Sequence, residues 1–229
     1  GLMEMATRIV DMVNSVFSGF AKRLALPIFM KRGLRDPELS QQYWRLTLLT
    51  TAMAMVVYVT LIAGAPWLLS NFLGPKWHDA GVIAQFLSVA AGLQALRYFS
   101  FDLANMQFKP GVNLMCQSVA ALIYIAGAFT ITDASATSIG QAWVVCTLAI
   151  VATSSLIFAA TGTLRVWAPG WRSLTLVVVS SGVAMAMAES VLHAGLNAVW
   201  AMAITLALHL ALSYVLAIGA WRALKHHAD

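Results

Sequence analysis

The sequence has very little charge. Only 10% of its 229 residues are Asp, Glu, Lys or Arg, whereas 60% are hydrophobic. A typical soluble domain is about 25% charged and about 45–50% apolar. A chain with this composition cannot cover itself with a hydrated surface, so the shortage of charge excludes an ordinary soluble domain and favours a protein whose solvent is lipid.

Cysteine and the usual catalytic motifs are also scarce. Cys116 and Cys146, the two cysteines, both lie inside apolar runs and have no metal-ligand spacing. We interpret them as small buried apolar residues. The chain contains no Ser/His/Asp set, no glycine-rich nucleotide loop and no Asp-rich sugar-nucleotide motif. We therefore expect no metal, no cofactor and no enzyme activity.

Long uncharged intervals take the place of these features. A helix needs about 20 mostly apolar residues to cross a membrane, and several intervals, such as that between Arg45 and Lys76, are long enough. Proline and glycine lie at the breaks, where they end helices. We predict an all-α transmembrane bundle of about seven helices in a single domain, 1–229. The expected helices are 2–29, 46–73, 80–106, 112–131, 137–163, 173–192 and 197–220.

Positive charges fall on one side of the predicted bundle. Positively charged residues favour the cytoplasmic side of a membrane, and the other side carries only Lys76. We therefore predict an external N-terminus and a cytoplasmic tail at Lys225-His226-His227. Because the net charge of +5 is explained in this way, nucleic-acid binding is not expected. The cytoplasmic charges are Lys22, Arg23, Lys31, Arg32, Arg35, Arg45, Lys109, Arg165, Arg172, Arg222 and Lys225.

The first predicted helix carries a polar stripe that lipid does not accept. At about 100° per residue, its polar side chains share an arc roughly 80° wide. One interpretation is a salt-bridged packing seam, or a face exposed because partner helices are absent. The other is a transport cavity, in which Arg8 holds an anionic group and Glu4 or Asp11 binds a proton or cation. The stripe consists of Glu4, Arg8, Asp11, Ser15, Ser18 and Lys22.

Four polar residues in later helices are further candidates. Arg97 lies deep in the third predicted helix, where a cavity role and a structural role are equally consistent with the sequence. His209 lies in the middle of the last helix, and we favour a hydrogen-bonded interhelical contact over a proton relay. Asn113 and Gln117 are spaced i,i+4, and we interpret them as another interhelical contact.

Four stretches carry a resemblance to a known family. The chain resembles the C-terminal half of bacterial polysaccharide flippases (O-antigen or exopolysaccharide, Wzx-type), in the multidrug/oligosaccharidyl-lipid/polysaccharide exporter superfamily. The likeness extends from Gly1 to about Arg165, although Gly111 replaces an expected acidic residue and Met3 an expected aromatic one. The matching stretches are Gly1-Leu2 through Ala6-Thr7-Arg8-Ile9-Val10; Leu26-Pro27-Ile28-Phe29 with Asp36-Pro37-Glu38-Leu39; Phe72-Leu73-Gly74-Pro75-Lys76-Trp77; and Phe108-Lys109-Pro110-Gly111-Val112-Asn113.

The resemblance implies one half of a two-bundle, V-shaped transporter in the bacterial inner membrane, with the N-terminal bundle outside this sequence. It implies alternating access that flips an undecaprenyl-pyrophosphate-linked oligosaccharide, with Arg8 and Arg97 as phosphate-binding candidates and Glu4 and Asp11 as cation- or proton-coupling candidates. Expected partners are the lipid-linked oligosaccharide, the bilayer, the N-terminal bundle and polysaccharide polymerase or export machinery. The alternatives are a multidrug or lipid II exporter and, disfavoured by the short external loops, a membrane-embedded glycan transferase or polymerase.

Overall fold

The structure, a computed structural model, describes residues 1–30, 38–131, 133, 135–162, 170–194 and 197–225. These residues form helices and no strand, which confirms the predicted all-α class. The elements are α1 (Leu2–Met30), α2 (Glu38–Leu73), the 3₁₀ helix η1 (Pro75–Trp77), α3 (His78–Ala95), α4 (Ser100–Met106), α5 (Pro110–Phe129), α6 (Ala136–Ala160), α7 (Gly170–Ala194) and α8 (Ala198–Lys225).

Six helical stretches among the described residues are long and apolar enough to cross a membrane. With α1, which is 29 residues long but carries the charged arc, the structure has the predicted set of about seven long helices. The chain is therefore a multi-pass membrane protein. The six stretches are Tyr43–Leu73, Pro75–Asn105, Pro110–Phe129, Ala136–Ala160, Arg172–Val191 and Ala198–Leu216.

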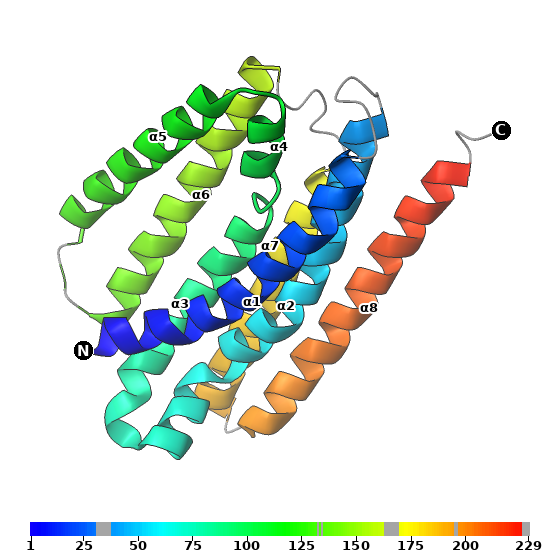
Figure 1. Ribbon diagram of the computed structural model, residues 1–229. Helices are drawn as coiled ribbons and strands as arrows, with labels where there is room; N and C mark the ends of the chain where they lie inside the picture. The colour runs from blue at the N-terminus through cyan, green and yellow to red at the C-terminus, as the bar shows by residue number, and fades with distance from the viewer. Residues whose placement is uncertain (31–37, 132, 134, 163–169, 195–196, 226–229) are drawn as a thin grey trace.

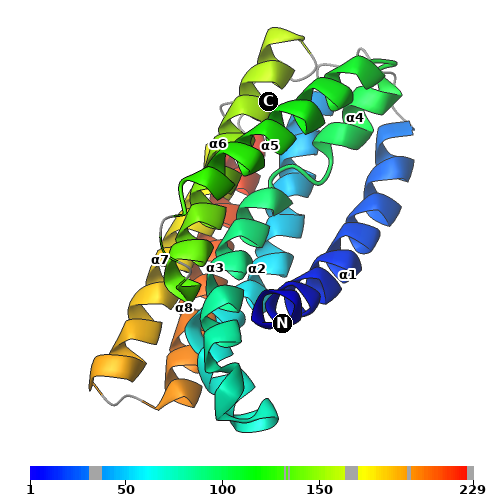
Figure 2. The ribbon, with the colours of Figure 1, turned by 90° about the vertical axis from the view of Figure 1, so that its left-hand side faces the viewer.

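Helix α2 lies at the centre of the bundle. It packs against α3, α7 and α8, while α3 also packs against α6, and α5 lies on α6. Figure 1 shows this order from α5 at one edge to α8 at the other, with successive long helices running in opposite directions. Helix α1 packs on α3 and α2, and Figure 2 shows that it inclines away from them toward its C-terminal end.

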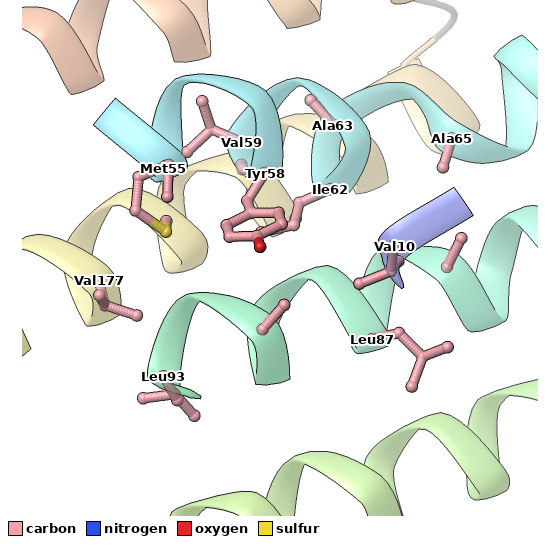
Figure 3. Packing of buried hydrophobic residues seen from close by; sticks show 14 of the residues in the cluster. Val10, Met55, Tyr58, Val59, Ile62, Ala63, Ala65, Leu87, Leu93 and Val177 are labelled. Atoms are coloured by element: carbon pink, nitrogen blue, oxygen red, sulfur yellow. The ribbon is translucent and has the colours of Figure 1, made fainter. Parts of the chain in front are cut away.

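The core lies where α1, α2, α3 and α7 meet. Tyr58 of α2 is fully buried there, and Val10 of α1 is 5% exposed. In Figure 3 the Tyr58 ring points from α2 toward α3, while Met55 faces Val177 of α7. These apolar contacts fix the position of α1 on the bundle, and so decide which side of α1 faces outward.

Pro66 removes one backbone hydrogen bond from α2, and a side chain of α3 replaces it. Proline has no N–H, so the carbonyl of Ile62, four residues earlier, loses its helical donor. Gln85 of α3 supplies a donor instead, with its Nε2 2.6 Å from the Ile62 oxygen and its side chain 8% exposed. Gly81 leaves room for this approach, because a Cβ there would lie 2.7 Å from the Pro66 nitrogen.

The third predicted helix is not continuous. The prediction of one helix over 80–106 was wrong between α3 and α4, where residues 96–99 leave the α-helical pattern. Arg97 N donates to Gln94 O at 2.9 Å and Ser100 N to Arg97 O at 3.1 Å, which are i→i+3 bonds. These bonds tighten the backbone into turns. The break places Arg97 at the boundary between the two helices.

Candidate functional site

A cavity of about 370 Å³ lies beside the break between α3 and α4. Its walls come from α1, α3, α4, α5, α6 and the break itself. Side chains that can donate or accept hydrogen bonds supply much of the lining, which is unusual inside a bundle that lipid surrounds. These side chains are Ser18, Gln94, Arg97, Tyr98, Asp102, Gln117 and Tyr124.

Among the described residues that line this cavity, Arg97 is the cation. It lies within the apolar span Pro75–Asn105, and its guanidinium carbon is 4.9 Å from the centre of the Phe101 ring. Its Nε is buried and has no hydrogen-bond partner. Asp102 lines the same cavity, but no ion pair among the described residues involves Arg97.

A guanidinium without a carboxylate partner is expensive at this depth. Insertion scales put an arginine at a helix centre at about 2.5–3.5 kcal/mol, and the Phe101 face compensates only part of that, at about 0.5–2 kcal/mol. An anionic ligand in the cavity would supply the missing charge. The geometry of the guanidinium also suits an anion, because its planar fork binds phosphate oxygens through two parallel hydrogen bonds.

Amide and hydroxyl groups from α3 and α5 also line the cavity. Gln94 Nε2 donates to the Tyr124 hydroxyl at 3.4 Å, and that hydroxyl lies 3.4 Å from Thr147 Oγ1 of α6. The Tyr124 ring packs on Trp143, with ring centres 5.0 Å apart. Gln117 lines the cavity from α5 and is exposed. These groups provide donors and acceptors for a hydroxyl-rich ligand.

Three hydrogen-bonding side chains join α1 to the cavity. Asn14 Oδ1 accepts a hydrogen bond from the Tyr58 hydroxyl at 3.1 Å and another from the Tyr98 hydroxyl, and the two hydroxyl oxygens lie 3.4 Å apart. Sequence reasoning missed Asn14 and Tyr58. The available signal was an amide at the edge of the polar arc of α1, on the side of its apolar face.

The charged arc of α1 lies away from the cavity. Arg8 and Glu4 form an ion pair of 2.7 Å with side chains 74% and 61% exposed, and Asp11 is also exposed. None of the three lines the cavity. The reason is that Ala6 and Val10 occupy the buried face of α1, which turns the charged arc outward. Only the polar end of the arc, at Ser18, reaches the cavity; the Lys22 side chain lies outside the described residues.

The remaining candidates hold helices together. His209, 2% exposed, bonds Ser180 Oγ of α7 through Nδ1 and the Ala52 carbonyl of α2 through Nε2, both at 2.9 Å. Since a carbonyl only accepts, Nε2 carries the proton and Nδ1 accepts from Ser180. Asn113 Nδ2 donates to Phe101 O at 3.1 Å and to Asn105 Oδ1 at 2.5 Å, which joins α5 to α4.

Within the part of the chain that the structure describes, no three His, Cys, Asp or Glu side chains gather as a metal site would require. Comparison with known proteins adds no identity: no protein-family model, no curated protein and no solved structure matches this chain. The cavity and the residues that line it are therefore the features from which a function can be inferred.

Proposed function

We propose that this chain is part of a membrane transporter for an anionic, lipid-linked substrate, and that Arg97 binds the anionic group. The single observation that carries the proposal is the Arg97 guanidinium, which lines a 370 Å³ cavity within an apolar span and forms no ion pair with another described residue. Ionisable groups at membrane depth mark substrate pathways by default.

The substrate class follows from the resemblance and from the chemistry of the lining together. Polysaccharide flippases carry an undecaprenyl-pyrophosphate-linked oligosaccharide, and a pyrophosphate suits the guanidinium of Arg97. The side chains of Gln94, Gln117 and Tyr124 suit sugar hydroxyl groups. We propose flipping of such a lipid, in polysaccharide or lipopolysaccharide biosynthesis, as the function.

We further propose that the membrane is a bacterial inner membrane and that the α2 start faces the cytoplasm. The starts of α2, α5 and α7 lie at one end of the bundle in Figure 1. Lys109 and Arg172 lie at the starts of α5 and α7, and Arg45 lies about two turns into α2. Lys76 lies at the opposite end, in η1. This asymmetry is what positive charges on the cytoplasmic side produce. The predicted cytoplasmic residues Lys31, Arg32, Arg35, Arg165, His226 and His227 lie outside the described residues.

The outer face of α1 supports a second helical bundle as partner. Glu4, Arg8 and Asp11 are exposed there together with Met12 and Val16, which are 71% and 64% exposed. Lipid tails do not accept the charges and water does not favour the apolar side chains, whereas another polar helix face satisfies both. Polysaccharide polymerase and export proteins are the further partners that this function implies.

Translocation in vesicles tests the proposal. The protein, in the form that its own gene encodes, is reconstituted with a fluorescent undecaprenyl-pyrophosphate oligosaccharide, and a membrane-impermeant quencher reports flipping. We expect wild type to flip the lipid and Arg97→Gln to slow flipping about tenfold or more, since hydrogen bonds to charged groups contribute about 1.5–3 kcal/mol. Arg45→Gln, outside the cavity, is the matched control. Equal rates for wild type and Arg97→Gln would refute the role of Arg97, and no flipping by wild type would refute the function.

A further inference from the structure

The hydrogen bonds among Asn14, Tyr58 and Tyr98 join three segments that are far apart in the sequence. Asn14 belongs to α1, Tyr58 to the centre of α2, and Tyr98 to the break between α3 and α4. Around them the contact between α1 and the bundle is apolar, with Val10, Val13 and Phe17 on the α1 side. These three side chains form a polar link in an otherwise apolar contact, and we call them the Asn14 link.

The chemistry of the Asn14 link gives it a single arrangement. A carbonyl oxygen has two lone pairs and accepts both phenolic hydrogens, so each tyrosine donates once to Asn14. The Tyr58 side chain is fully buried, and if α1 moved away its hydroxyl would lose the Asn14 acceptor and keep only the Tyr98 hydroxyl, 3.4 Å away, as a described partner. Losing a hydrogen bond from a buried hydroxyl is unfavourable, so the bonds hold α1 against α2 and the break.

The Asn14 link lies at the wall of the Arg97 cavity. Ser18, one turn beyond Asn14 on α1, lines the cavity, and so does Tyr98. Tyr98 is also the residue next to Arg97 in the break, where the backbone bonds are i→i+3. Helix α1 inclines away from the bundle toward its C-terminal end (Figure 2). The Asn14 link is therefore in a position to control how close Ser18 and its side of α1 lie to the rest of the cavity wall.

We infer that the Asn14 link is a latch that controls access to Arg97: with its bonds made, α1 closes one wall of the cavity, and with them broken, α1 moves outward and exposes it. Asn14 and Tyr98 act as positioning residues, through α1 and through the break. The inference rests on the proposed function in treating the cavity as a transport site. Its test uses no substrate, so it can fail while flipping by the wild-type protein succeeds.

Thiol labelling measures this access directly. Cys116→Ala and Cys146→Ala remove the native thiols, and Ser18→Cys then places one thiol at the cavity wall. The reagent is a negatively charged methanethiosulfonate applied to the full chain in vesicles at fixed pH. Tyr58→Phe with Tyr98→Phe removes both donors to Asn14 at nearly constant volume. We expect labelling at position 18 to become about five- to tenfold faster, because interhelical hydrogen bonds in membranes each shift such an equilibrium severalfold.

Three controls make each outcome decisive. Tyr214→Phe removes an exposed hydroxyl from α8, with the ring 68% exposed, and should leave the labelling rate unchanged. Asn14→Ala removes the shared acceptor and should reproduce the double tyrosine variant. Gly111→Cys, where an added Cβ meets nothing within 4 Å, reports general changes in labelling at an exposed site that does not line the cavity. Faster labelling at position 18 alone supports the latch. An unchanged rate there, or an equal increase at position 111, overturns it.

Discussion

The outer face of α1 and the break between α3 and α4 both bring charge into an apolar bundle, but they do so in opposite ways. On α1, Arg8 is exposed and paired with Glu4 at 2.7 Å. In the break, Arg97 is partly buried, lines a cavity, and forms no ion pair within the part of the chain that the structure describes. A paired, exposed arginine is satisfied within its own helix. An arginine in a cavity, with no counter-charge among the described residues, is the position at which we propose that an anionic ligand binds.

The same contrast applies to packing space. Around α1 the outward side is open, whereas α2 and α3 approach closely enough to need glycine at the contact. The space around Gly19 of α1 and Gly81 of α3 shows this difference. A Cβ added at Gly19 would meet nothing within 4 Å, whereas one added at Gly81 would lie 2.7 Å from the Pro66 nitrogen. Substituting each of these two glycines therefore tests the difference in packing between the two regions.

Matched glycine substitutions should have opposite effects. Alanine favours a helix over glycine by about 1 kcal/mol, so Gly19→Ala should leave stability unchanged or slightly higher. Gly81→Ala should lower it by about 1–3 kcal/mol or more, because the backbone of Pro66 has no room to move. Thermal unfolding of the detergent-solubilised protein measures both. Equal melting temperatures would show that α2 and α3 are not in close contact at Gly81.

Removing the Gln85 side chain, which replaces the hydrogen bond that Pro66 removes from α2, should lower the stability of the protein nearly as much. Gln85→Leu leaves the Ile62 carbonyl buried without its donor, which should destabilise the protein by about 1–3 kcal/mol. Pro66→Ala restores an N–H to α2, so the loss on Gln85→Leu should be smaller in that background. A double-mutant cycle of melting temperatures gives the coupling. Additive losses of stability would mean that the Gln85 hydrogen bond does not compensate for the donor that Pro66 lacks.

Breaking the ion pair on α1 should have the smallest effect. Glu4→Gln removes an exposed carboxylate, and exposed ion pairs contribute little because water already solvates both groups. We expect no measurable change in the melting temperature of the chain, at low or high salt. A clear, salt-dependent loss would show that the pair is part of a buried network, and would remove the contrast between Arg8 and Arg97.

The sequence alone predicted the helical class, because apolar length and proline or glycine breaks determine where membrane helices start and stop. It did not predict the break at residues 96–99. No proline or glycine marks it, and the turn is associated with hydrogen bonds from Tyr98 to a distant helix. It also did not predict the hydrogen bond that replaces the one removed by Pro66, since its donor, Gln85, belongs to another helix.

The candidate site could be predicted from the sequence only in part, because its residues come from several helices. The polar arc on α1 was visible from its periodicity, but periodicity does not say which face packs. Small residues such as Ala6, together with Val10, decide that by fitting against α2 and α3. Arg97 was a candidate because of its depth, whereas Gln94 and Tyr124 had no sequence signal, since they meet only when α3 and α5 come together.

Equilibrium binding of undecaprenyl pyrophosphate tests the central contrast most directly. The ligand is titrated against purified wild type, Arg97→Gln and Arg8→Gln, and intrinsic tryptophan fluorescence or calorimetry reports binding. We predict that Arg97→Gln weakens affinity about tenfold or more, because it removes the cavity cation, and that Arg8→Gln changes it less than about twofold. Loss of affinity on Arg8→Gln with none on Arg97→Gln would contradict the account.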